Sequence, residues 1–123
     1  MSDLPEIYRR HLAAATGDPA GLETVWEPDG VREFPYAPAG STARVDGVPA
    51  MIDYFTGLTG WANWSFTDEI VRGIGDEFVV EVHGSADRDG GGRYEQDYIV
   101  RFGVSPRGRI AWMREFWDPT RFN

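Results

Sequence analysis

Residues 92–123 read GRYEQDYIVRFGVSPRGRIAWMREFWDPTRFN, and this stretch carries the strongest structural signal in the chain. Two runs that are rich in Tyr, Ile, Val, Phe and Trp flank the tetrapeptide Ser105-Pro106-Arg107-Gly108. Proline presets the backbone φ angle in a turn, and glycine adopts conformations that other residues avoid. The pattern therefore predicts a long β-hairpin in which the two runs are antiparallel strands.

Side chains alternate between the two sides of a strand, so the hairpin residues can be sorted into two faces. If Ser105 lies opposite Gly108, then Tyr98 lies opposite Glu115. The first face, called face A, carries Tyr94, Gln96, Tyr98, Val100, Phe102, Ala111, Met113, Glu115 and Trp117. The second, face B, carries Glu95, Asp97, Ile99, Arg101, Ile110, Trp112, Arg114, Phe116 and Asp118. A three-residue loop would exchange the faces of one strand.

Face A contains a single carboxylate, Glu115, among mostly apolar side chains. A carboxyl group in such surroundings is expected to have a raised pKa, and proteins obtain a general acid or base for neutral pH in this way. The alternative is a structural glutamate that is hydrogen-bonded to Tyr98. Glu115 is therefore the first candidate catalytic residue. The candidate substrate-binding residues around it are Gln96, Tyr98, Met113 and Trp117.

The composition limits the class of protein. The 123 residues are 41% hydrophobic and 14% aromatic, which predicts one globular domain. The chain has no cysteine, so disulfides, thiolate nucleophiles and zinc–thiolate sites are excluded. A net charge of -8 argues against nucleic acid or an anionic membrane as the main partner. The start, MSDLPEIYRR, has no apolar run, so we expect no signal peptide or membrane helix, and a cytoplasmic location fits.

The first half of the chain shows helical spacing of apolar residues. Residues 3–16 form one such stretch, with Asp3 as a plausible cap. A second helix is expected over residues 18–27 and a third over residues 46–58, with a short strand over residues 31–36 between them. From residue 64 onward the alternation is that of strands, which predicts a four-strand meander. This order predicts an α+β domain with its helices on one face of an antiparallel sheet.

Four motifs support a family resemblance: FPYAP at 34–38, ARVDG at 43–47, YEQDY at 94–98 and RGRIAWMREFWDP at 107–119. Together they resemble the SnoaL-like branch of the nuclear transport factor 2-like superfamily. The closing REFWDP most resembles the phenazine-biosynthesis A/B proteins. The resemblance implies a cone-shaped α+β barrel, in which three N-terminal helices pack in a curved, mostly antiparallel sheet and leave a pocket at its open end. It extends over nearly the whole chain, so residues 1–123 are expected to form one domain.

The resemblance also implies a range of activities. Relatives include ketosteroid isomerase, polyketide cyclases, epoxide hydrolases, dehydratases and non-catalytic binding modules. In the phenazine-biosynthesis relatives a glutamate of the closing strand faces the pocket and acts as acid and base, and Glu115 is the matching position. We expect this chain to lack the extra N-terminal segment of those relatives, which puts their specific condensation in doubt.

Four histidine and tyrosine residues carry possible chemistry. His83 shares a strand face with Glu81, and a histidine beside a carboxylate is a usable proton shuttle, although this face could instead meet solvent or a partner subunit. Tyr36 and Tyr98 are candidate hydrogen-bond donors to a substrate carbonyl, or tyrosines with structural partners. His11 lies on the apolar stripe of the first helix, where a core histidine is the simpler interpretation.

No carboxylate–histidine spacing matches a metal site and no nucleophile motif is present, so we expect neither metal nor cofactor. Proton transfer on a bound molecule remains. The leading hypothesis is a cofactor-free enzyme, an isomerase, cyclase or dehydratase, that acts on a small, apolar, oxygenated ligand. The alternatives are a ligand-binding module without turnover and a protein-interaction domain with a vestigial pocket.

Face B predicts an assembly. Helices can cover only one face of the sheet, so apolar residues on the other face would meet water in a monomer. These residues are Ile99, Ile110, Trp112 and Phe116. We expect a homodimer that buries them by two-fold symmetry, with a different protein partner as the competing hypothesis. The charged residues that could pair across such an interface are Arg101, Arg114, Glu95 and Asp97.

Overall fold

The structure is a computed structural model that describes residues 5–122, so the expected cap Asp3 lies outside the described residues. Helices and strands follow one another as α1 (Glu6–Thr16), the 3-10 helix η1 (Pro19–Thr24), β1 (Trp26–Glu33), β2 (Arg44–Asp46), α2 (Val48–Thr56), β3 (Trp61–Ile74), β4 (Glu77–Arg88), β5 (Arg93–Val104), β6 (Ile110–Trp117) and the 3-10 helix η2 (Pro119–Phe122).

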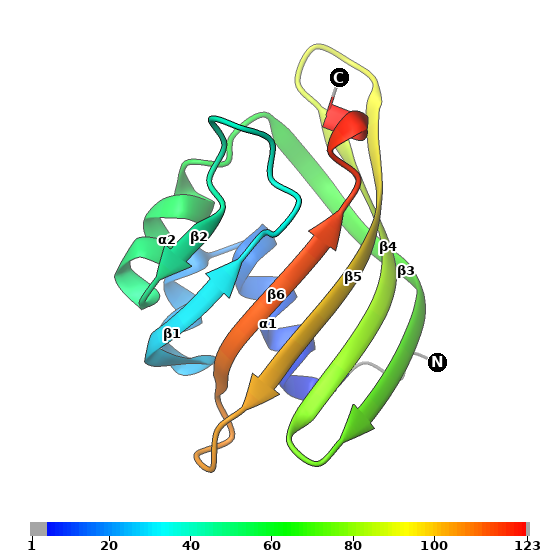
Figure 1. Ribbon diagram of the computed structural model, residues 1–123. Helices are drawn as coiled ribbons and strands as arrows, with labels where there is room; N and C mark the ends of the chain where they lie inside the picture. Colours follow the sequence, from blue (N-terminus) through cyan, green and yellow to red (C-terminus); the bar gives the residue numbers. More distant parts are fainter. Residues whose placement is uncertain (1–4, 123) are drawn as a thin grey trace.

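One curved sheet contains all the strands of the described residues, in the order β2-β1-β6-β5-β4-β3. The β1–β6 pairing is parallel and the other pairings are antiparallel. Helices α1 and α2 lie on one side of this sheet, which curves around them (Figure 1). The cone-shaped α+β arrangement with a mostly antiparallel sheet is therefore confirmed. Within the described part of the chain, no helix is both long and apolar enough to cross a membrane.

The turn of the β5–β6 hairpin is longer than expected. The Ser105 amide donates to the Arg109 carbonyl at 2.7 Å, and the Gly108 amide donates to the Ser105 carbonyl at 2.9 Å. Ser105 is thus opposite Arg109, and the loop has three residues. Gly108 has a φ of +76°, a conformation that glycine adopts without a steric cost. This loop by itself exchanges the faces of β6.

A β-bulge a few residues later reverses the exchange. Val104 lies opposite Ile110, but Gly103 lies opposite Trp112, so Ala111 is an extra residue on β6. From Trp112 onward the side chains return to the expected faces. Only the start of the strand keeps the exchanged orientation, and Ile110, which we expected on face B, is fully buried in the core.

The resulting register pairs Tyr98 with Trp117 and Val100 with Glu115. The expected pairing of Tyr98 with Glu115 is therefore wrong by two residues. Because side chains repeat every two residues along a strand, a shift of two leaves the faces unchanged. Glu115 shares the inner face with Tyr98 and Trp117, as the alternation predicted.

The second expected helix is only the short η1. Asp18 begins it as a cap, and its carboxylate accepts from the Ala20 amide at 3.2 Å. Trp26, expected at the end of that helix, instead begins β1. Residues 28–30, expected to be a break, lie inside β1, because the pairing with β6 is irregular between Trp26 and Val31 and proline is tolerated at such a bulge.

Two further strand boundaries differ from the sequence-based expectations. β2 lies partly in the expected loop 37–44, and three residues are too few to show a periodic pattern. β3 begins at Trp61 rather than Trp64, with a register irregularity between Ala62 and Ser65. Asn63, in this irregular segment, has a φ of +55°, a conformation that asparagine accepts more readily than most residues.

The core lies between the helices and the inner sheet face. Its fully buried side chains interlock α1, α2 and all the strands except β3, which contributes partly buried residues. The largest apolar members with almost no exposed surface are Trp26, Phe102, Leu22, Met51, Ile110 and Met113. Full burial of one such side chain stabilises the fold by roughly 1.5–3 kcal/mol.

Candidate functional site

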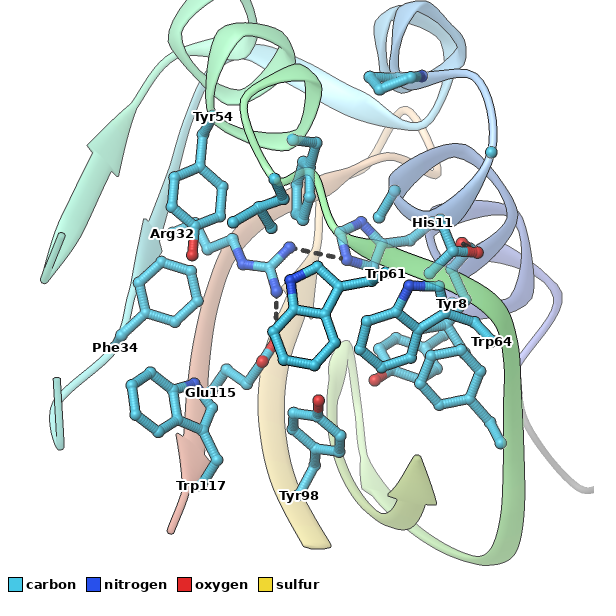
Figure 2. A pocket seen from close by; sticks show the side chains of 18 of the residues that line it. Tyr8, His11, Arg32, Phe34, Tyr54, Trp61, Trp64, Tyr98, Glu115 and Trp117 are labelled. Atoms are coloured by element: carbon cyan, nitrogen blue, oxygen red, sulfur yellow. Dashed lines mark hydrogen bonds and ion pairs between the residues drawn. The ribbon is translucent and has the colours of Figure 1, made fainter. Parts of the chain in front are cut away.

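A cavity of about 670 Å³ is lined by residues of α1, β1, α2, β3, β5 and β6. This volume falls within the range of small-molecule sites. Its walls are mainly aromatic, and prominent among them are Phe34, Tyr54, Trp61, Trp64, Tyr98 and Trp117 (Figure 2). The bulged start of β3 contributes two of these, Trp61 and Trp64, which contact one another and Tyr94.

Glu115 of β6 reaches this cavity and forms an ion pair with Arg32 of β1 (Figure 2). Arg32 Nη2 donates to Glu115 Oε2, and the two side chains are only 5% and 12% exposed. The sequence placed Glu115 in largely apolar surroundings, so the expectation missed a cation. Each charge loses its hydration on burial, and each therefore depends on the other.

Arg32 is the site residue that the sequence analysis overlooked. Its guanidinium lies over the rings of Phe34 and Phe55, with its Cζ atom 5.0 and 4.7 Å from their centroids. Its Nε is buried and has no hydrogen-bond partner among the described residues. A signal was present in the sequence: Arg32 and Phe34 are two apart in an expected strand, so burial of the phenylalanine turns the arginine inward as well.

His11 of α1 is 1% exposed and lies beside Arg32. The Trp26 Nε1 donates to His11 Nδ1 at 3.0 Å, and Arg32 Nη1 is 3.0 Å from His11 Nε2. Burial first, and then the charge of Arg32, hold the pKa of His11 well below its ordinary value of 6.5. The expected core histidine is indeed buried, but its ring is also part of the cavity wall.

Tyr8 and Tyr98 supply hydroxyl groups to the cavity. Burial, and then the charge of Glu115, raise the pKa of both hydroxyls above the ordinary value of 10.0. Burial likewise raises the pKa of Tyr54. These tyrosines therefore stay protonated at neutral pH and can donate hydrogen bonds to a ligand.

Two expected substrate-binding residues lie beneath the cavity rather than in it. Gln96 has no exposed surface, and its amide donates to Tyr94 Oη at 3.0 Å and to the Asp118 carbonyl at 2.8 Å. Its Oε1 accepts from the Asp118 amide at 3.0 Å, so the side chain fastens the end of β6 to β5. Met113 is 1% exposed and belongs to the core. Neither residue lines the cavity.

His83 and Tyr36 do not line the cavity. Val80 and Val82 of β4 are buried in the core, so alternation turns His83 to the outer face. Tyr36 is 61% exposed and packs edge-on against Phe116. Both border a separate, more open groove of about 550 Å³. The register across residues 87–92, which the sequence did not determine, decided the position of His83.

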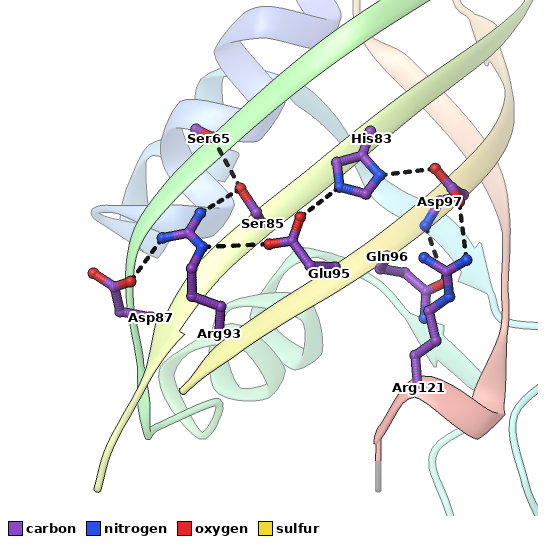
Figure 3. A network of polar contacts seen from close by, with 9 residues as sticks. All are labelled: Ser65, His83, Ser85, Asp87, Arg93, Glu95, Gln96, Asp97 and Arg121. Carbon is purple, nitrogen blue, oxygen red and sulfur yellow. Dashed lines mark hydrogen bonds and ion pairs between the residues drawn. The ribbon is translucent and has the colours of Figure 1, made fainter. Parts of the chain in front are cut away.

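His83 is held between two carboxylates (Figure 3). Its Nδ1 is 2.8 Å from Asp97 Oδ1, and its Nε2 is 2.8 Å from Glu95 Oε1. Arg93 and Arg121 pair with the same two carboxylates from either side. The hydrogen bonds to Glu95 and Asp97 raise the pKa of His83, and in turn they lower the pKa of Glu95 and Asp97.

These shifts predict a pH-dependent contribution to stability. The raised pKa of His83 gives a contribution that is complete below about 6.5 and is lost as the pH rises through its folded-state pKa. The lowered pKa of Glu95 gives one that is present above about 4.5 and is lost in more acidic solution. His83→Gln should therefore destabilise the protein most between these values, and little at alkaline pH. Urea unfolding at a series of pH values tests this, and a pH-independent difference would contradict it.

The chain resembles known proteins over most of its length. The sequence model of the SnoaL-like domain family matches residues 8–113 of this chain. A PhzA/B-like protein of Pseudomonas aeruginosa, itself uncharacterised, is 32% identical over 108 residues, which are 85% of this chain and 76% of that protein.

Solved structures of similar proteins superpose on most of this chain. A Bacillus subtilis protein proposed to be an isomerase superposes with a TM-score of 0.82 at 30% identity, covering 94% of this chain and 86% of that one. A Jannaschia protein proposed to be a SnoaL-like polyketide cyclase has a TM-score of 0.74 at 19% identity and covers 99% and 94%. The expected resemblance to SnoaL-like proteins is confirmed, and the chain belongs to the SnoaL-like domain family.

Proposed function

We propose that this protein is a cofactor-free enzyme of the isomerase, cyclase or dehydratase type, in which Glu115 moves a proton on a small, apolar, oxygenated ligand. The observation that carries this proposal is the position of Glu115. Among the described residues that line the aromatic cavity, it is the only carboxylate. A partly buried carboxylate in a ligand-sized cavity is suited to general acid–base catalysis.

The surroundings of Glu115 support a reaction at a carbon next to a carbonyl group. The aromatic walls would hold the apolar body of a ligand, and the protonated Tyr8 and Tyr98 can donate to its oxygen atoms. The carboxylate would take the proton from carbon and return it to the same or another carbon. Similarity to a protein proposed to be an isomerase is in keeping with this chemistry.

A second candidate is a ligand-binding module without turnover. The observation that favours it is the ion pair itself, because the carboxylate that should act as a base already accepts from Arg32. The two candidates differ in one measurable property. An enzyme of the proposed type exchanges the acidic C–H protons of a carbonyl compound with solvent, whereas a binding module does not.

Deuterium exchange is therefore the test. The probe is 2-tetralone, a two-ring ketone with acidic C–H groups beside its carbonyl, dissolved in D₂O with the protein and followed by proton NMR. We expect loss of the C–H signals faster than in buffer with an equal amount of an unrelated protein. Binding of 2-tetralone without faster exchange would favour the binding module.

We further propose that the outer sheet face forms a homodimer. Ile110 is buried in the core and so does not belong to the expected apolar patch. Three other apolar residues on this face, Ile70, Val79 and Ile99, are 47%, 39% and 48% exposed. Trp112 lies opposite Gly103, and the Cζ atom of Arg101 is 5.0 Å from the centroid of its ring. An exposed apolar sheet face that is interleaved with charges suits a two-fold contact.

Light scattering tests this assembly. We expect twice the chain mass of 13.8 kDa, and a buried area of roughly 1,200–2,000 Å² in total would be typical of such a dimer. Trp112→Glu should give a monomer that keeps the cavity. Ala13→Glu, which adds the same charge to the exposed side of α1, is the control and should remain dimeric. A wild-type monomer at micromolar concentration would refute the proposal.

A further inference from the structure

The bulge near the start of β3 sets the direction of two tryptophans. Trp61 and Trp64 are three residues apart, so regular alternation would place them on opposite faces of the sheet. Between Ala62 and Ser65, however, β3 advances by three residues while the paired strand β4 advances by only two. β3 therefore contains one extra residue, and this residue lets both indoles line the same cavity.

Asn63 provides the backbone conformation that the bulge needs. Among the described residues it is the only one besides glycines with a positive φ, at +55°. Asparagine adopts this conformation more readily than most residues, whereas β-branched residues almost never do. Its side-chain Nδ2 donates to Asp87 Oδ2 of β4 at 2.8 Å. The backbone preference of Asn63 and this hydrogen bond both hold the bulge in place.

A series of polar contacts on the outer face continues from this hydrogen bond. Asp87 Oδ1 accepts from Arg93 Nη1 at 2.8 Å, and Arg93 Nη2 donates to Ser85 Oγ at 2.8 Å. Ser85 Oγ is in turn 3.1 Å from Ser65 Oγ of β3 (Figure 3). The contacts that begin at Asn63 thus return to β3 directly after the bulge, so the strand is fastened on both sides of the extra residue.

On the inner face the two indoles pack against other aromatic rings. The ring centroids of Trp61 and Trp64 are 6.1 Å apart, with a tilt of 37° between the planes. Trp61 also meets Tyr94 edge-on at 4.6 Å, and Trp64 is stacked on Phe66 at 5.8 Å. Both indoles are only partly buried and lie at the cavity (Figure 2). Each therefore keeps ring surface that a ligand can contact.

We propose that Asn63 is a positioning residue for ligand specificity: its bulge turns both indoles inward, and their rings favour a ligand with a flat aromatic ring over one with puckered saturated rings. Asn63 does not line the cavity and acts through the two tryptophans. Aromatic pairs contribute favourable contacts beyond the area that they bury, and a saturated ring cannot form them. This inference rests on the proposed function for its ligand cavity, but it does not require turnover.

The binding of two matched ketones tests the specificity. The probes are 2-tetralone and 2-decalone, which share the same two-ring carbon skeleton, and only 2-tetralone contains a flat aromatic ring. We expect the wild type to bind 2-tetralone at least about fivefold more tightly in isothermal titration calorimetry, because both indoles can contact the aromatic ring. Equal affinities, or no binding of 2-tetralone, would overturn the proposal.

Substitutions at the bulge test the role of Asn63. Valine resists a positive φ, so Asn63→Val should make the strand regular, turn Trp61 away from the cavity and reduce the preference for 2-tetralone to about twofold or less. Asn63→Gly should keep the preference, since glycine adopts a positive φ without a steric cost. Ala62→Val adds the same side chain at a regularly paired position and is the control, with the wild-type preference.

Deletion of Asn63 is the most specific variant. Trp61, Ala62 and Trp64 then become consecutive, and regular alternation directs both indoles inward without a bulge. We therefore expect the deletion to keep the preference for 2-tetralone that Asn63→Val loses. A deletion variant without this preference, or Asn63→Val with the wild-type preference, would overturn the proposal.

Circular dichroism tests the geometry without a ligand. Two indoles in contact couple electronically and give a pair of far-ultraviolet bands of opposite sign, and Trp61→Phe identifies these bands by their loss. We expect them in the wild type and in the deletion variant, and we expect them to be weak in Asn63→Val. Thermal unfolding checks that each variant is folded. Unchanged bands in folded Asn63→Val would overturn the proposal.

The outcomes separate this proposal from the proposed catalysis. A wild type that shows the preference and the paired bands, but does not speed the exchange of 2-tetralone, would overturn the catalytic proposal alone. Faster exchange together with an unchanged preference in Asn63→Val would overturn only the role of Asn63. The second result is expected if the bulge merely protects β3, the last strand of the sheet, from pairing with other chains.

Discussion

Glu115→Gln is expected to slow the deuterium exchange of 2-tetralone by roughly 10²-fold or more, which is the usual contribution of a positioned acid or base. Glutamine has nearly the same shape, and its amide oxygen can still accept from Arg32, so the cavity should keep its form. The buried Arg32 loses its counter-charge, so the variant should also be less stable than the wild type. It cannot take up the substrate proton. Proton NMR in D₂O gives the exchange rate, and circular dichroism reports whether the variant is folded.

The matched control is Glu33→Gln. Glu33 belongs to β1 like Arg32, but its side chain is 39% exposed and pairs with Arg44 rather than with a cavity residue. This variant should exchange 2-tetralone at the wild-type rate. If Glu115→Gln is folded and exchanges 2-tetralone as fast as the wild type, Glu115 is not the base.

Arg32→Met is expected to have the largest effect on stability, a loss of about 3–5 kcal/mol in the free energy of unfolding. Methionine fills a similar space between Phe34 and Phe55 but leaves the Glu115 carboxylate buried without a counter-charge. Most of the loss comes from this unpaired charge. Urea unfolding followed by tryptophan fluorescence measures it.

A double variant separates the ion pair from the packing. Arg32→Met combined with Glu115→Leu removes both charges, and replacing a whole buried pair by apolar residues is often close to neutral. We therefore expect the double variant to be more stable than Arg32→Met alone. Arg101→Met is the exposed control, since Arg101 and Glu77 are 47% and 54% exposed, and its effect should stay below about 1 kcal/mol. A double variant as unstable as Arg32→Met would show that packing, and not the unpaired carboxylate, causes the loss.

The sequence correctly predicted which hairpin residues face inward, although the assumed turn was wrong. The three-residue loop and the bulge at Ala111 each shift the pairing by one residue, and the total shift of two residues restores the expected faces from Trp112 onward. Buried side chains must continue the inner face on both strands, so the hydrophobic alternation constrains the final register even where the turn does not. Ile110, between the loop and the bulge, is the residue for which the prediction failed.

The helices and short strands were harder to predict. Residues 18–27 have the caps and apolar spacing of a helix, but six of them form only η1, and Trp26 joins β1. The pairing of β1 with β6 overrides the local helical preference, and a short window of sequence contains no information about this pairing. β2 has only the three residues Arg44–Asp46, and its pairing with β1 defines it more than its own pattern.

The sequence by itself determined that Glu115, Tyr98 and Trp117 share the inner face, because alternation along a strand is a local property that each residue pair repeats. Only the tertiary structure decided what Glu115 meets there. Arg32 is 83 residues away in the chain, and the parallel pairing of β1 with β6, which places Arg32 beside Met113, brings it to the carboxylate. The outward position of His83 was likewise decided by the tertiary structure and not by the local sequence. Contacts between distant segments depend on strand order and register, and these follow from the packing of the whole core rather than from any single stretch of residues.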